Sequence, residues 1–169
     1  TFHSFAETGF DLPRTTTFVE EKLRSYGLEP VRCGKAGITC VIGDPGKGKC
    51  FLLRGDMDAL PMTEESGLPF AAQNGHCHSC GHDTHTAMLL AAARLLSEYA
   101  DELPGCVKLM FQPAEELLAG ALDMIEHGLL ENPTVDAGIG LHISIGGGAE
   151  TAVGKISYKP GIANFSGDA

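Results

Sequence analysis

Apolar residues recur at helical spacing in three segments of the chain, residues 13–26, 84–99 and 118–129. In the first segment, Pro13 can occupy the opening turn of a helix, and Gly27 follows the last apolar position, where helices commonly stop. The second segment is rich in Ala and Leu and is apolar almost all the way round, which is typical of a buried helix. The spacing therefore predicts three helices.

Short apolar runs between and after these helices predict four strands, at residues 38–42, 50–53, 106–111 and 137–141. The first two runs are separated by residues 43–49, which contain Gly, Pro and Asp and have the composition of a turn. We therefore expect these two strands to pair as a hairpin. Strands that alternate with helices indicate an α/β sandwich built around a mostly parallel sheet.

The composition is that of an ordinary globular domain and narrows the choice of partners. The chain has 169 residues, 43% of them hydrophobic and 20% charged, which fits one domain, or one domain and a fragment. Twelve Lys and Arg stand against 22 Asp and Glu, for a formal net charge of -10. So acidic a surface repels phosphate backbones and anionic lipid, which disfavours nucleic acid and membranes as partners.

Neither a membrane helix nor a signal peptide is expected from the sequence. No apolar run approaches the roughly 20 residues that a membrane helix needs, and the opening residues lack the pattern of a signal peptide. Because the first residue is Thr1, we expect the natural start to be missing.

Six cysteines are present, and their positions favour free thiols over disulfides. Cys33, Cys40, Cys50 and Cys106 are scattered, and the last three lie in strand-like segments, where a free Cys packs as a small hydrophobe. We therefore expect a reducing, cytoplasmic setting.

Polar residues follow the predicted strands at the points where those strands end. Residues 54–58 follow the second strand, residues 112–116 the third, and His142 the fourth. Residues 76–85 contain four His and two Cys, and they close a long loop over residues 55–82 just before the buried helix. Because the carboxyl ends of parallel strands line one crevice, we expect these groups to converge. Thiolate, imidazole and carboxylate together suit zinc-type ions better than magnesium or calcium.

Within the His-rich segment, Cys80 and His82 are spaced so that both side chains can point the same way from an extended backbone. Asp83 beside them can hold a ligating imidazole by a hydrogen bond. Two other interpretations stay open here. Cys77 and Cys80 could form a redox pair, or residues 76–85 could close a structural zinc site by themselves.

Several motifs also have ordinary explanations. Glu115 and Glu116, taken alone, would more often be a solvated helix start than a site. His3 and His127 are expected to be ordinary histidines, and residues 54–56 spell an adhesion tripeptide.

Four motifs together resemble the family of N-acyl-amino-acid amidohydrolases, which includes bacterial aminoacylases, hippurate hydrolases and plant auxin-conjugate hydrolases. The motifs are Arg54-Gly55-Asp56-Met57-Asp58-Ala59-Leu60-Pro61, Cys80-Gly81-His82-Asp83-Thr84-His85-Thr86-Ala87, Gln112-Pro113-Ala114-Glu115-Glu116 and Gly140-Leu141-His142. They occur in the family's order with similar intervals, and residues 3–10 and 68–70 match as well. The resemblance thus spans essentially the whole chain.

This resemblance implies a two-metal centre whose ligands in this chain are Cys80, His82, Glu116 and His142. It also implies that Glu115 is the general base and that Asp58 steadies the metal site. Asp56 and Asp83 would hold ligating side chains in place without binding the ions themselves. The ions would be two divalent metals per full-length chain, zinc or manganese, with nickel or cobalt as alternatives, and no organic cofactor is expected.

The resemblance further implies a three-layer α/β sandwich of the zinc-peptidase type. Residues 1–155 would form the N-terminal part of the catalytic domain, and residues 156–169 the start of an inserted dimerisation domain. Because family members are more than twice this length, we expect a fifth ligand outside this chain and a homodimer when full length. Two departures stand out: Cys77 occupies a position where Met is frequent, and residues 117–119 replace a Gly-rich stretch, which puts the shape of that loop in question.

The function that follows is metal-dependent hydrolysis of the amide bond of N-acyl amino acids, by a water activated between two metals. A dipeptidase or carboxypeptidase with the same metal centre is the alternative. Two further hypotheses belong to other classes. One is a non-catalytic metal-binding module, which would have no need of Glu115 as a base. The other is a thiol-dependent enzyme using Cys80 or Cys77, which would need no added metal.

Overall fold

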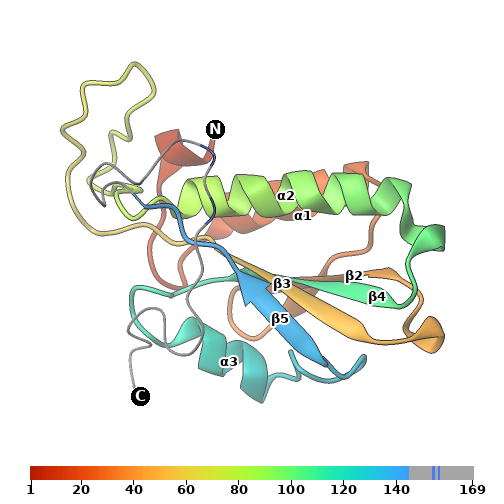
Figure 1. Cartoon of the computed structure of the whole chain (residues 1–169). Helices are drawn as coiled ribbons and strands as arrows, with labels where there is room; N and C mark the ends of the chain where they lie inside the picture. The colour runs from red at the N-terminus through yellow and green to blue at the C-terminus, as the bar shows by residue number, and fades with distance from the viewer. Residues whose placement is uncertain (145–153, 155, 157–169) are drawn as a thin grey trace.

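The chain folds into a central β-sheet with helices on both faces, as Figure 1 shows. This computed structural model describes residues 1–144, 154 and 156. The helices are α1 (Pro13–Ser25), α2 (His82–Glu98) and α3 (Gly120–Glu126), with short 3-10 turns η1 (Phe2–Phe5), η2 (Pro45–Lys47) and η3 (Ala100–Glu102). The strands are β1 (Val31–Cys33), β2 (Gly37–Gly43), β3 (Cys50–Asp56), β4 (Cys106–Gln112) and β5 (Ala137–Gly140). They form one sheet in the order β1-β2-β4-β3-β5.

The three-layer α/β sandwich is confirmed. Helices α1 and α2 cover one face of the sheet, and α3 lies on the other (Figure 1). The sheet is mixed: β3 runs parallel to both β4 and β5, whereas β2 is antiparallel to both β1 and β4. The expected start of a second domain at residues 156–169 lies, apart from Ile156, outside the described residues.

The hairpin predicted for residues 38–42 and 50–53 is wrong, because β4 lies between β2 and β3 and pairs with both. Every residue of β4 except Val107 is buried, and such a strand needs a neighbour on each side and a layer on each face. The predicted turn instead passes the start of β4. There the Asp44 N–H donates to the Gly105 carbonyl, and the Cys106 N–H donates to the Lys49 carbonyl. The hairpin partner of β2 is β1, which is only three residues long.

The helix predicted for residues 84–99 is present as α2 but is not buried all round. Met88 and Leu95 are 44% and 60% exposed. The buried positions instead form one face, made up of His82, His85, Thr86, Leu89, Leu90 and Ala93. Helix α2 also begins earlier than predicted, at His82, directly after Gly81 with its φ of 86°.

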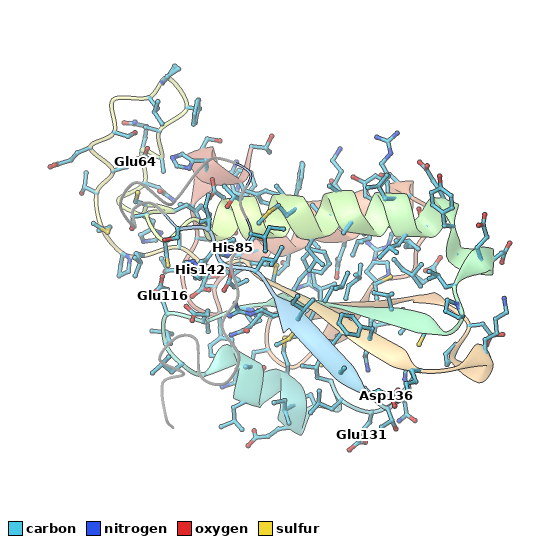
Figure 2. All side chains as sticks on the ribbon, viewed as in Figure 1. Glu64, His85, Glu116, Glu131, Asp136 and His142 are labelled. Carbon is cyan, nitrogen blue, oxygen red and sulfur yellow. The ribbon has the colours of Figure 1, made fainter. Side chains whose placement is uncertain are left out.

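The hydrophobic core fixes the position of β3 and β4, whose last residues lie at the candidate site. Phe111 and Leu109 of β4 are fully buried among Val19 of α1 and Leu89 of α2. Because β3 and β4 are parallel and in register, their last residues lie side by side, and this edge meets the N-terminus of α2. The expected convergence of polar groups at the carboxyl ends of the strands is therefore confirmed (Figure 2).

Two smaller expectations concern membrane helices and disulfides. No helix in the described part of the chain is both long enough and apolar enough to cross a membrane. All six cysteines are free thiols, as their spacing predicted.

Candidate metal centre

His82 lies at the middle of the candidate site. It is the first residue of α2 and is fully buried. Its Nε2 faces carboxylate oxygens of Asp56 at 3.7 Å, Glu115 at 3.7 Å and Glu116 at 3.8 Å. Within the described residues neither ring nitrogen has a hydrogen-bond partner, and the same is true of the facing Glu116 Oε1. Unpartnered buried atoms are costly, so atoms that converge in this way fit a bound cation.

Cys80 and His142 complete this group from two other segments. Cys80 Sγ lies 3.4 Å from His142 Nε2, and the ligand atoms of Cys80, His82 and His142 all lie within 4.8 Å of one another. A second such group consists of His82, Glu115 and Glu116. The four residues predicted as ligands are thus brought together, with the predicted base beside them. His142 and Glu116 can be followed in Figure 2.

One buried carboxylate organises the loop that carries both glutamates. Asp58 is 1% exposed. Its Oδ1 accepts from the backbone N–H of Glu115 at 3.0 Å, and its Oδ2 accepts from that of Glu116 at 3.2 Å. Oδ1 also lies 3.4 Å from Nδ1 of His82. Asp58 therefore joins His82 to the two glutamates, a role that the sequence indicated only through resemblance.

Asp56 is fully buried at the end of β3 and is surrounded by donors. Its Oδ1 lies 2.6 Å from Nδ1 of His85, and its Oδ2 pairs with Nη1 of Arg54 at 2.7 Å. Burial by itself would raise the pKa of Asp56, but the His85 hydrogen bond and the Arg54 charge outweigh it and lower that pKa. The adhesion-tripeptide interpretation fails, because Asp56 is inaccessible to a partner protein.

The prediction that Asp83 holds a ligating imidazole is corrected by the structure. Asp83 Oδ2 lies 2.9 Å from Nδ1 of His3, whose Nε2 lies 2.9 Å from Glu64. The half-buried His3 therefore ties the N-terminal segment to the loop and to α2. Burial would lower the pKa of His3, but Glu64 and Asp83 together raise it. His127 fits the ordinary reading, since its Nδ1 contacts only its own helix, at the Asp123 carbonyl.

A profile comparison decides the family. Residues 52–164 match Peptidase family M20/M25/M40. The chain belongs to this family. The resemblance drawn from the four motifs is thereby confirmed.

Three relatives show how much of the M20 proteins this chain represents. N-acetyl-L-cysteine deacetylase of Bacillus subtilis (strain 168) is 42% identical over 162 residues, 94% of this chain and 37% of that protein. Thermostable carboxypeptidase 1 of Saccharolobus solfataricus is 43% identical over 148 residues, 84% of this chain and 37% of that protein. A solved Bacillus subtilis structure, a dinuclear metal-binding peptidase of the M20 family, matches with a TM-score of 0.80 and 37% identity, over 85% of this chain and 40% of that one. The chain therefore spans well under half the length of these relatives.

The electrostatics of this M20 site disfavour a reactive thiol. Burial raises the pKa of Cys80 to about 11, with Glu116 and Glu115 adding to the effect, and burial also raises the pKa of Cys77. A nucleophilic or redox-active thiol needs a lowered pKa, so both thiol interpretations are disfavoured. The group formed by Cys80 and His82 includes His142, which follows β5. This group therefore does not fit a structural zinc site closed within residues 76–85.

Sequence reasoning missed His85 as a site residue. Its ring contacts Asp56, and its centroid lies 4.6 Å from that of His142. The available signal was its position three residues after His82, because residues at that spacing share one face of a helix.

The M20 chain carries backbone strain in the loop after the paired glutamates. Leu118 has a φ of 52°, a left-handed conformation that costs a residue with a Cβ about 1–2 kcal/mol. Glycine adopts it without that cost. Leu118 is 62% exposed, so its side chain contributes little burial in return. The helix predicted to start at Leu118 begins only at Gly120 for the same reason.

Leu118→Gly is expected to raise the free energy of unfolding by up to about 1 kcal/mol, because relieved strain exceeds the entropy added to the unfolded chain. Chemical denaturation of the full-length protein measures the change. Leu117→Gly is the matched control, since Leu117 is equally exposed but is not left-handed, and it should be neutral or destabilising. Equal destabilisation by both changes would contradict the strain argument.

Proposed function

We propose that the full-length protein carrying this chain hydrolyses the amide bond of N-acyl amino acids with a metal-activated water. The observation that carries the proposal is the placement of two adjacent glutamates around His82. Glu115 and Glu116 each direct one carboxylate oxygen toward the unpartnered Nε2 of His82, at 3.7 and 3.8 Å. One of the two carboxylates can then bind metal while the other accepts and releases a proton.

The donor set supports the assignment of ligands. Cys80, His82, Glu116 and His142 would hold the ions, and a thiolate with two imidazoles favours zinc, nickel or cobalt over calcium. Manganese is proposed beside zinc on the motif resemblance. Divalent ions bound there would polarise the substrate carbonyl and lower the pKa of a bound water toward about 7. Because the pKa of the Cys80 thiol is about 11 in the metal-free chain, binding at neutral pH would displace its proton.

Glu115 is the proposed base. It takes a proton from the water whose oxygen bonds to the carbonyl carbon, and it delivers that proton to the amide nitrogen as the C–N bond breaks. The products are a carboxylic acid and a free amino acid. Asp58 supports this role by holding the backbone N–H of Glu115 and of Glu116, so that the two carboxylates keep their separate directions.

The substrate class rests on the motif resemblance and on relatives that include a deacetylase of N-acetyl-L-cysteine. The carboxypeptidase relative favours the second candidate, a dipeptidase or carboxypeptidase that uses the same residues. We also propose that the full-length protein is a cytoplasmic homodimer. Residues 1–155 would belong to its catalytic domain, and residues 156–169 would begin a dimerisation domain. Nucleic acid and membranes are not proposed as partners.

The test compares substrates on full-length, metal-loaded protein. N-acetyl amino acids, hippurate and unblocked dipeptides are assayed side by side, and we expect turnover of the N-acyl compounds. Cleavage of dipeptides with no N-acyl substrate accepted would overturn the amidohydrolase proposal in favour of the peptidase. Absence of any metal-dependent turnover across the panel would overturn both.

A further inference from the structure

We propose that His85 is a positioning residue that sets the ligand nitrogen of His142 through the backbone of Ile143. This inference rests on the proposed role of His142 as a metal ligand. It concerns a residue that belongs to neither the proposed ligands nor the proposed base.

The tautomer of His85 follows from its two partners. The backbone N–H of Ile143 lies 2.9 Å from Nε2 of His85, and an N–H can only donate, so Nε2 is the acceptor. Nδ1 of a neutral imidazole must then carry the proton, and it donates to Asp56 Oδ1 at 2.6 Å. Both nitrogens of His85 are used by these bonds. Although His85 lies near Asp56 and His82 in a group that could hold an ion, it has no lone pair left to bind one.

The same residue, Ile143, also sets the tautomer of His142 through its carbonyl. The carbonyl oxygen of Ile143 lies 2.6 Å from Nδ1 of His142, and a carbonyl can only accept, so Nδ1 carries the proton. The lone pair of His142 is therefore on Nε2, the atom that lies 3.4 Å from Cys80 Sγ. Ile143 thus receives a bond from His142 through its C=O and gives one to His85 through its N–H.

This support matters because His142 and Ile143 lie beyond the last paired residue of β5. The pairing of β5 with β3 ends at Gly140, opposite Arg54, and every residue of β5 is exposed. His142 and Ile143 are exposed as well. The anchor for this segment is His85, which is 2% exposed and is itself held by Asp56.

Asp56, which holds His85, is itself fixed by several hydrogen bonds. Arg54 and His85 hold the two oxygens of Asp56, and the Thr86 hydroxyl donates to the Asp56 carbonyl at 2.8 Å. A Cβ added at Gly55 would meet the His85 carbonyl at 3.0 Å, so β3 and α2 approach closely here. The contacts from Arg54 through Asp56 and His85 to Ile143 therefore join the sheet to the segment that carries His142. His85 and His142 are labelled in Figure 2.

The experiment compares His85→Gln with His85→Asn in the full-length protein. The Gln amide reaches the position of Nε2 and can accept from Ile143, whereas the shorter Asn amide reaches only the position of Nδ1 and Asp56. Zinc affinity is measured by competition with a chromophoric chelator, and the cobalt(II) absorption spectrum reports the ligand set. We expect His85→Asn to weaken zinc binding about 10–100-fold, as changes to residues that orient metal ligands do, and to alter the cobalt spectrum. His85→Gln should retain most of the affinity.

A double-mutant cycle separates positioning from general destabilisation. If His85 acts through His142, His85→Asn should cause little further loss of zinc affinity in a His142→Ala background. Equal losses in both backgrounds, or a His85→Gln variant as weak as His85→Asn, would overturn the proposal. Wild-type protein that bound no zinc would instead overturn the proposed function, so the two failures are distinguishable.

Discussion

Glu115→Gln is expected to lower kcat by about 10²–10⁴-fold, the usual contribution of general acid–base catalysis, while leaving metal content unchanged. Glutamine preserves the shape of the side chain and the backbone bond to Asp58, but it cannot take a proton at neutral pH. Steady-state kinetics on an N-acyl amino acid and elemental analysis of the same preparation give the two measurements.

Glu116→Gln is the matched control for that result, because it makes the same chemical change at the next residue. Glu116 has a buried oxygen without a partner, facing His82 at 3.8 Å, so its variant should lose metal together with activity. Equal metal content in the two variants would contradict the division of roles between base and ligand.

His82→Ala is expected to remove most of the bound metal and, with it, the activity. Each of the three groups of residues that could hold an ion in the described part of the chain includes His82, so no ligand set at this site is complete without it. A chelator should inactivate the wild-type protein in the same way, and added zinc or manganese should restore it. Metal content by elemental analysis and activity after reconstitution are the measurements.

His127→Ala controls for the loss of a histidine as such. Its imidazole contacts the carbonyl of Asp123 in its own helix and takes no part in the cluster around His82, so metal content and activity should stay at the wild-type level. A His82→Ala protein with full metal content and activity would show that the metal centre lies elsewhere.

Segments whose pattern depends on neighbours in sequence were predictable. Helix α1 and strand β4 lie where the spacing of apolar residues placed them, because a helix or strand that buries one face must repeat apolar residues at its own period. The burial of α2 was not predictable from composition. An Ala- and Leu-rich helix buries only the face that finds a partner, and Met88 and Leu95 lie on the other face.

Strand order was the largest error, and its cause is long-range. A turn composition at residues 43–49 predicts a reversal of the chain but says nothing of which strand lies alongside. The strand that separates β2 from β3 begins at Cys106, far along the chain, and it takes the central place because nearly all of its side chains are buried.

By itself, the sequence determined which chemical groups follow each strand, and therefore that thiol, imidazole and carboxylate gather at one edge of the sheet. Parallel strands end at a common edge whatever their order, so the convergence of these groups was predictable. The choice of Cys80, His82, Glu116 and His142 as ligands came from the motif resemblance. Only the tertiary structure decided the partner of each supporting group. The Asp58 carboxylate faces the ring of His82, whereas the Asp83 carboxylate contacts His3. His85 bonds to Ile143, 58 residues away. Such bonds depend on distances and angles between segments that packing alone brings together, and no local period in the chain encodes them.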